Sequence, residues 1–361
     1  MSKFLKAVFQ QFSGIVGAGI FALPFIFYYS NFYLAIGLVV AVAVIMFILN
    51  NFYATIICHT AQDHQLPGYA HKYLGSKAKL ISLFGLLFSC FGILLAYVKL
   101  AATFIHLSLP QLPFLSAAIL FIILISGLHL SKFNFSKNII QFIPVINLIV
   151  ILVIFLNSKI FSPVNFNQIS PNIIYFGGII FALTGFTIIP EVEETLRSLK
   201  NKKFFLRLAS GIGLVLAIMV YFLFTYSVIR IGSGNVSSDA VTHIFNQHPI
   251  SGYLLIFFGI TTILRSSLNF LLIIKEIFYR DLNISSSISY FISILFFFST
   301  LLLINLPFIK VISFVGLIST FISASIICLI RQKISKNIFT IFGTFLILSI
   351  LSTGIILQYL F

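Results

Sequence analysis

Long apolar stretches separated by short polar links run along the whole chain. A membrane-spanning helix needs about 20 consecutive apolar residues. The stretches are continuously apolar and lack the alternation of a β-barrel strand, so they predict helices. Eleven such runs are present, at about 7–30, 32–58, 80–107, 112–130, 139–157, 173–196, 204–229, 250–274, 284–304, 308–330 and 338–360.

The links between these runs are too short to form a second domain. We therefore expect one membrane domain over residues 1–361. The first run follows two lysines, as in a signal peptide, but it contains Pro24 and continues beyond the length of such a peptide. We expect it to be retained as the first helix.

Composition agrees with a membrane protein. Charged residues make up 8% of the chain, apolar residues make up 60%, and the mean hydropathy is +1.14. An average soluble domain carries roughly a quarter charged residues. This composition excludes a cytosolic enzyme, a disordered chain and a disulfide scaffold, and it indicates a polytopic membrane protein.

The basic residues alternate between links and predict the orientation. With a cytoplasmic N-terminus, 17 Lys and Arg residues fall in inner segments and two, Lys159 and Arg230, in outer ones. We therefore expect a plasma (cytoplasmic) membrane protein with a cytoplasmic N-terminus and, after eleven spans, an outer C-terminus. The net charge of +15 is then a topology signal, and no nucleic-acid partner is expected.

Two of the runs contain glycines followed by a proline, which is a poor continuous helix. Gly19 and Pro24 lie in the first run, and Gly185 and Pro190 lie at the same interval in the sixth. Close packing of small residues would explain either run alone. Interrupted helices at matching places in two halves instead indicate the binding site of an inverted-repeat transporter.

The residues around these interruptions resemble a known family. The segment Ser13 to Pro24 is similar to the helix 1 signature of the amino acid–polyamine–organocation superfamily. Phe181 to Phe186 and Ile189 to Glu191 resemble helix 6 of its aromatic amino acid and amino acid/auxin permease branches, and Leu66 to Gly75 resembles the loop between helices 2 and 3.

This resemblance implies an all-α polytopic membrane protein with the LeuT-type 5+5 inverted repeat and an amino acid substrate. Helices 1 and 6 would be unwound at mid-membrane. The first repeat would cover about 7–157, the second about 173–330, and 338–360 would be an extra helix.

The resemblance also implies a substrate site at the two interruptions. Backbone amides at the first would hold the substrate carboxylate, and carbonyls at the second would hold its amino group. Tyr97 is a further candidate for lining the site. The implied contacts are Gly17, Ala18 and Gly19 for the carboxylate, Phe181, Ala182 and Thr184 for the amino group, and Phe186 for the wall of the side-chain pocket.

Arg265 lies about 10 residues before Lys275, roughly 15 Å from the inner end of its helix, and needs an acidic, carbonyl or aqueous partner there. Sodium-coupled members of this fold hold an ion between helix 1 and hydroxyl groups of helix 8, where Ser266 and Ser267 are the candidates here. We hypothesise that the guanidinium replaces the ion, so that transport is proton-coupled or an exchange. The alternative is a structural arginine bonded to carbonyls.

Lys99 and Glu191 are the other candidates for coupling or gating. Lys99 either extends to the outer membrane surface or is a switchable cation near the substrate path. Family members with a lysine in place of sodium carry it on helix 5, which has none in its interior here. Glu191 is a candidate proton acceptor or inner-gate residue and the expected acidic partner of a buried cation, whereas Glu193 and Glu194 are interpreted as a solvated face.

The neutral residues at the interruptions favour a neutral amino acid, aromatic or branched, and no acidic residue is present there for a cationic side chain. The expected function is a secondary transporter that works by alternating access in the lipid bilayer, with a proton as a candidate co-substrate. A channel or receptor-like sensor on the same fold is the alternative, and an integral-membrane transferase would need a catalytic cluster that the sequence lacks. The scattered cysteines and histidines predict no metal site, and no cofactor is expected.

Overall fold

The computed structural model describes residues 2–30, 32–60, 63–131, 143–161 and 175–360. Each of the eleven predicted runs falls on one helix or on a pair of helices. The helices that carry the runs, in chain order, are α1 (Lys3–Ile15) with α2 (Gly19–Tyr29), α3 (Phe32–His59), α5 (Ser76–Ser108), α6 (Phe114–Leu130), α8 (Ile143–Ser158), α9 (Phe176–Leu183) with α10 (Ile189–Leu196), α11 (Lys202–Ile231), α13 (Pro249–Glu276), α14 (Ser286–Ser299), α15 (Phe308–Ile334) and α16 (Ile338–Leu360).

The first residues of two predicted runs, 139–142 and 173–174, lie outside the described residues, as do Lys132 and Lys137. Short elements connect or extend the long helices. They are α4 (Leu66–Leu74), α12 (Thr242–Gln247), the 3-10 helices η2 (Phe186–Ile188) and η4 (Thr300–Leu303), and the π-helical turn η3 (Ile277–Asp281).

By length and apolar composition, the described part of the chain has eight helices that could cross a membrane, or nine when the bent pair α1 and α2 is taken as one span. The helices α6 and α8 are apolar but shorter, with 17 and 16 residues. A backbone in lipid has no water to bond, which is why continuous apolar runs of this length fold as helices. The exact number of eleven spans stays a prediction.

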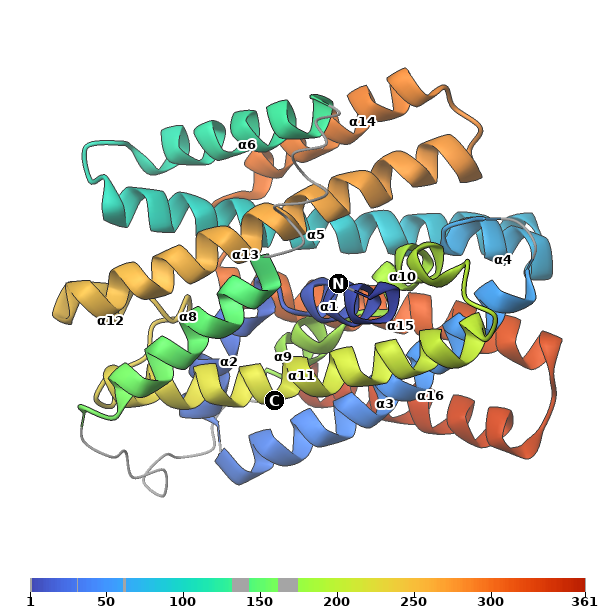
Figure 1. The fold of residues 1–361 in the computed structure, drawn as a ribbon, viewed down its shortest axis with the longest axis horizontal. Coiled ribbons are helices and arrows are strands. Elements are labelled where there is room, and N and C mark those ends of the chain that lie inside the picture. Colours follow the sequence, from blue (N-terminus) through green and yellow to red (C-terminus); the bar gives the residue numbers. More distant parts are fainter. Residues whose placement is uncertain (1, 31, 61–62, 132–142, 162–174, 361) are drawn as a thin grey trace.

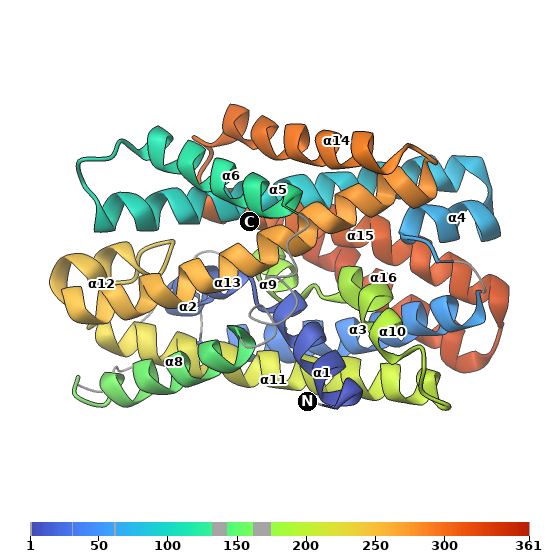
Figure 2. The same ribbon diagram turned by 45° about the horizontal axis from the view of Figure 1, so that its top comes forward.

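The long helices form two layers with the short, interrupted helices between them (Figures 1 and 2). The helices α5, α6, α13 and α14 make one layer, and α3, α11 and α16 lie on the opposite side. Between the layers, α1 packs mainly on α11 and α10, while α9 packs on α2 and α15. The interruptions predicted from the glycines therefore lie inside the protein.

The basic links come together at one end of the molecule, on the right in Figure 1. The helices α3, α10, α13 and α15 end there, and α4, α5, α11 and α16 begin there. We call this the basic end, because the described links there carry Lys and Arg residues from Lys72 to Lys336. The opposite end carries Lys159 and Arg230.

Local sequence signals explain the short helix α4 at the basic end. Pro67 lies in its first turn, where the missing amide hydrogen costs nothing. Gly75 ends the helix with a φ of 90°, a left-handed conformation that favours glycine, and its amide bonds to the His71 carbonyl. The loop with a family resemblance is therefore a helix with a proline start and a glycine stop.

Candidate functional site

The first predicted interruption separates α1 from α2. The two helices meet at an angle of 55°, and Val16 between them has an extended backbone. The first backbone bond of α2 runs from the Ile20 amide to the Gly17 carbonyl, so the amides of residues 17–19 lie at a helix N-terminus. Pro24 lies inside α2 and not at the break, which shows that the glycines rather than the proline interrupt the helix.

The second predicted interruption separates α9 from α10. Thr184 and Gly185 have non-helical backbone angles, and a 3-10 turn leads from them into α10. Pro190 lies in the first turn of α10, where a proline favours a new helix start. This break therefore exposes carbonyls at the end of α9 and amides at the start of the next segment.

The two breaks face each other. A Cβ atom on Gly19 would lie 2.5 Å from the Cα atom of Ala182, so only glycine permits this approach. On the other side, a Cβ atom on Gly185 would collide with the Ile15 side chain at the end of α1. The structure thus brings Gly19 and Ala182, both predicted site residues, into direct contact.

Tyr221 of α11 joins the two broken helices. Its hydroxyl lies 2.8 Å from the Ile15 carbonyl and 2.6 Å from the Ala182 carbonyl, so its single O–H is shared between these two acceptors. Both carbonyls belong to last turns of helices, where intrahelical partners are absent. The Ala182 carbonyl, expected to bind the substrate amino group, already accepts this bond and has one further lone pair.

Further polar side chains bond to carbonyls of the second break. The buried Gln11 side chain of α1 donates to the Gly185 carbonyl at 2.9 Å. The Thr184 hydroxyl donates to the Ile180 carbonyl at 2.7 Å and lies 3.2 Å from the Thr320 hydroxyl of α15. These bonds hold the unwound backbone in a defined conformation inside the apolar core.

Tyr97 of α5 lies against the first break. Its hydroxyl contacts Gly17 and is within hydrogen-bonding reach of the Ala18 backbone and the Ser266 side chain. The structure thus places the predicted residues Gly17, Ala18, Tyr97 and Ser266 together.

The two phenylalanines predicted at the second break differ in their surroundings. The Phe181 side chain packs against Leu95 of α5 and Val311 and Val315 of α15. Phe186 is 1% exposed within η2. A role of Phe186 in walling a side-chain pocket stays a prediction.

Four buried phenylalanines form a cluster next to the breaks, on the side away from the basic end. Phe21 of α2 lies 5.3 Å from both Phe104 and Phe224 and 5.8 Å from Phe258, measured between ring centroids. Phe104 follows Tyr97 by seven residues in α5, and Phe258 precedes Arg265 by seven residues in α13. Because the two helices run in opposite directions, each phenylalanine lies roughly 10 Å further from the basic end than its partner in this comparison. The cluster therefore closes the path from the breaks to that side.

Arg265 of α13 lies at a small cavity beside the first break. The residue is 7% exposed, and its Nε and Nη1 atoms have no hydrogen-bond partner among the described residues. Ser13 and Val16 of α1 line the cavity, as do Asn147 of α8 and Thr262. Arg265 thus lies beside α1, and its Nε and Nη1 atoms bond to no carbonyl of the described residues. Both interpretations of this arginine stay predictions.

The two candidate hydroxyls beside Arg265 have different surroundings. Ser266 lines the same cavity and contacts Tyr97. Ser267 is completely buried, and its hydroxyl has no hydrogen-bond partner among the described residues. Of the two, Ser266 is the one next to the first break.

The structure places Lys99 and Glu191 away from Arg265. The Lys99 ammonium donates to the Ile304 carbonyl at 2.9 Å, at the end of η4. Glu191 accepts a bond of 3.0 Å from the Gln65 side chain, and its second carboxyl oxygen is buried without a partner among the described residues. Glu191 was expected to be the acidic partner of a buried cation, but among the described residues it forms no ion pair.

Ion pairs gather at the basic end. Arg197 contacts Asp63 at 2.7 Å and Glu193 at 2.9 Å, and these carboxylates, Glu193 first, raise the pKa of Arg197. Glu193 is 4% exposed, so the solvated face predicted for it is wrong: Arg197 and Lys202 pair with it in the protein. Glu194, as predicted, is exposed.

Two contacts at the basic end connect the interrupted helix α10 to other elements. Arg280 of η3 contacts Glu194 at 2.9 Å, and Gln65 contacts Glu191. Arg280 also pairs with Glu276 in its own helix. These contacts hold α10 against the end of α13 and the start of α4.

Sequence reasoning missed Gln11, Gln65, Tyr221 and the phenylalanine cluster. Gln11 and Tyr221 carried a usable signal, because a polar group within an apolar run needs a partner in the protein. Nothing in the sequence distinguishes the four clustered phenylalanines from the other 40. Among the residues that the structure describes, no three His, Cys, Asp or Glu side chains gather as they would around a metal ion.

Fold and site together define an α-helical membrane protein with the LeuT-type architecture, in which two interrupted helices face each other. The manganese transporter of Eremococcus coleocola, solved with an aromatic bis-isothiourea substituted compound, has a similar structure, with a TM-score of 0.71 and 15% identity over 98% of this chain and 86% of that one. MhsT in complex with L-phenylalanine is also similar, with a TM-score of 0.68 and 13% identity over 99% of this chain and 98% of that one. These comparisons confirm the predicted fold class.

No protein-family model and no curated protein sequence matches the chain. Membership of the amino acid–polyamine–organocation superfamily, and of its aromatic branch, therefore stays a prediction. At 13–15% identity, the two solved structures show a shared fold and nothing further about the substrate.

Proposed function

We propose that this protein is a secondary transporter that carries a neutral amino acid, aromatic or branched, across the plasma membrane by alternating access. The observation that carries the proposal is the contact between the two breaks, with Gly19 against Ala182. The exposed amides at the start of α2 suit a carboxylate, and the carbonyls at the end of α9 suit an ammonium group. An amino acid carries both groups on one carbon atom.

The residues at the breaks favour an organic substrate over a metal ion. Residues 13–24 and 181–190 contain no carboxylate, imidazole or thiol side chain. Manganese prefers oxygen ligands such as carboxylates, together with nitrogen ligands. Although one structural neighbour is a manganese transporter, an amino acid such as the phenylalanine bound by MhsT fits this chemistry better.

The arrangement of contacts supports alternating access. The elements α1, α2, α3, α9, α10 and α11 would move against α5, α6, α13 and α14. The pair between Arg280 and Glu194 connects these groups at the basic end. The phenylalanine cluster connects them on the other side of the breaks. We propose that the basic end is cytoplasmic, as the distribution of Lys and Arg predicts.

Uptake into liposomes tests this function. The purified protein is reconstituted, and labelled phenylalanine, leucine, lysine and manganese are supplied under separate proton and sodium gradients. We expect a neutral amino acid to accumulate above its equilibrium level under the proton gradient, or to exchange with unlabelled amino acid inside, while protein-free liposomes take up none. Accumulation of lysine or manganese alone contradicts the proposed substrate, and simple equilibration indicates a channel.

We further propose that Arg265 replaces a sodium ion beside the first break. Substitution of external sodium by choline is then expected to leave uptake unchanged. The Arg265→Gln and Arg265→Met variants are expected to lose most transport, because they keep volume but not charge, while Arg265→Lys retains part of it. Initial uptake rates at constant pH are the measurement. Strict sodium dependence, or a fully active Arg265→Gln variant, would contradict the proposal.

Glu191 is the proposed proton acceptor. We expect Glu191→Gln to abolish accumulation driven by a proton gradient while amino acid exchange continues, because exchange needs no net proton movement. The two assays are run on the same liposomes. Lys200→Gln, at an exposed position just beyond α10, is the control and is expected to keep both activities. Loss of both activities in Glu191→Gln would assign this residue a structural role.

A further inference from the structure

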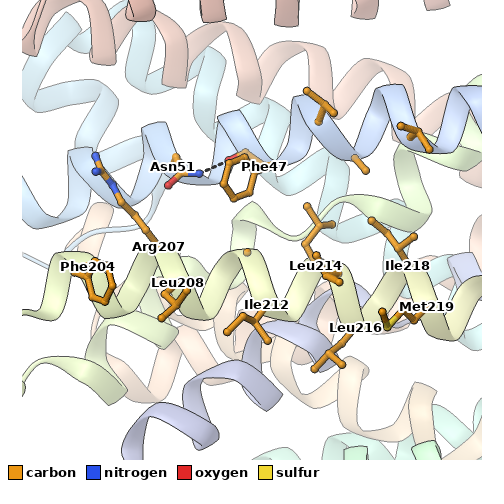
Figure 3. A pocket seen from close by; sticks show the side chains of 15 residues that line it. Phe47, Asn51, Phe204, Arg207, Leu208, Ile212, Leu214, Leu216, Ile218 and Met219 are labelled. Atoms are coloured by element: carbon orange, nitrogen blue, oxygen red, sulfur yellow. Dashed lines mark hydrogen bonds between the residues drawn. The ribbon is translucent and has the colours of Figure 1, made fainter.

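An apolar groove separate from the two breaks runs between α3 and α11 (Figure 3). Val44 and Phe47 of α3 form one wall, and the residues from Phe204 to Met219 of α11 contribute the other. This part of α11 is roughly 22 Å long at 1.5 Å per residue, whereas one leaflet of the hydrocarbon core is about 15 Å thick. The groove is thus long enough for an acyl chain that enters from one membrane surface.

The groove has a polar end. Figure 3 shows Arg207 and Asn51 there, with the Arg207 side chain directed from α11 towards α3. This is the basic end of the molecule, because α11 begins and α3 ends at it. The other labelled side chains along α11, from Leu208 onward, are apolar.

Two arginines near this end have unused hydrogen-bond donors. Arg207 donates to the Thr55 hydroxyl at 2.7 Å, but its Nε atom has no partner in the part of the chain that the structure describes. Arg331 of α15 lies 5.8 Å from the centre of the Phe52 ring of α3, and its Nε and Nη1 atoms have no partner among the described residues.

The two guanidinium groups both lie against the last part of α3, Arg207 at Thr55 and Arg331 over the ring of Phe52 one turn earlier. Neither Arg207 nor Arg331 forms an ion pair with a described acidic residue. The Lys and Arg residues that do form such pairs are Arg197, Lys202, Lys275 and Arg280. Two neighbouring positive charges at the edge of an apolar layer are unfavourable without an anion.

We propose that this groove binds an anionic phospholipid, with its phosphate at Arg207 and Arg331 and one acyl chain between α3 and α11. Guanidinium groups form paired hydrogen bonds with phosphate, and basic pockets between helices on the cytoplasmic side of membrane proteins bind anionic headgroups. The apolar length of the groove favours a lipid over free phosphate. Because Met219 lies two residues before Tyr221, a bound lipid stabilises the helix that joins the two breaks.

Thermal unfolding of the full chain in detergent tests this site. Phosphatidylglycerol, phosphatidylcholine and inorganic phosphate are added separately, and retained lipid is measured by native mass spectrometry. We expect phosphatidylglycerol to raise the Tm and to remain bound, phosphatidylcholine to have a smaller effect, and phosphate to have none. Equal shifts by both lipids would contradict the arginine site, and a shift by phosphate alone would make it a free-anion site.

Three variants separate the site from the general attraction of a basic protein to anionic lipid. The double variant Arg207→Gln/Arg331→Gln is expected to lose the advantage of phosphatidylglycerol over phosphatidylcholine. Val44→Trp fills the groove without changing charge and is expected to lose retention of both lipids. Lys77→Gln, at the start of α5 and outside the groove, is expected to behave like the unmodified protein. An equal loss in Lys77→Gln, or full retention in the double variant and Val44→Trp, would overturn the proposal.

Discussion

Replacement of Gly19 by alanine is expected to reduce amino acid uptake at least about fivefold. The added Cβ atom would lie 2.5 Å from the Cα atom of Ala182, and backbone cannot move aside as a flexible side chain can. Overpacking of this kind costs about 1–3 kcal/mol, which corresponds to roughly 5- to 150-fold in an equilibrium. The variant separates the two breaks and so displaces both halves of the proposed substrate site. Uptake into liposomes and the Tm of the purified variant are the measurements.

Gly37→Ala is the matched control for this experiment. Gly37 lies in α3, and a Cβ atom there would meet nothing within 4 Å. This variant is expected to transport normally and to be slightly more stable, because alanine favours a helix over glycine by about 1 kcal/mol. Full activity of Gly19→Ala would show that contact between the breaks is not needed for transport.

Removal of the Tyr221 hydroxyl is expected to have the second large effect. Tyr221→Phe leaves the Ile15 and Ala182 carbonyls without this donor, and an unsatisfied buried polar group costs about 1–3 kcal/mol. We expect a lower Tm and at least about a fivefold loss of uptake, since the hydroxyl holds the ends of α1 and α9 together. The ring itself remains, so the packing of α11 is unchanged.

Tyr226→Phe on the same helix is the control. Its hydroxyl lies on the exposed part of α11 and accepts a bond from Arg230. This variant is expected to keep its Tm and its uptake, because exposed pairs contribute little. If Tyr221→Phe keeps normal uptake with a lowered Tm, the hydroxyl serves folding alone.

Much of the fold followed from local sequence patterns. Apolar runs of about 20 residues leave a backbone in lipid little choice but the helix, and each predicted run lies on one helix or a pair. The glycines from Gly14 to Gly19 and at Gly185 also marked breaks that the structure has. Pro24 was less informative, because α2 continues through it.

The candidate site was only partly predictable. The glycine pattern predicted the two breaks, and the family resemblance implied Gly17, Ala18, Gly19 and Ala182 as site residues. The structure places Gly17 to Gly19 at a helix start and Ala182 against Gly19. Glu193 shows the opposite case: its position four residues from Arg197 predicted a solvated pair, yet packing buries it. Burial depends on which segment covers a helix face, and a short sequence window does not contain that segment.

The sequence by itself determined that the chain is a helical membrane protein, which end of it is basic, and where two helices break. Each of these properties arises from neighbouring residues, through hydrophobicity, charge and backbone freedom. Only the tertiary structure decided which groups complete the breaks. Gln11 reaches Gly185 across 174 positions, and Tyr221 reaches Ile15 across 206. Such bonds form because unpaired backbone groups in an apolar core need partners from whichever helix lies beside them.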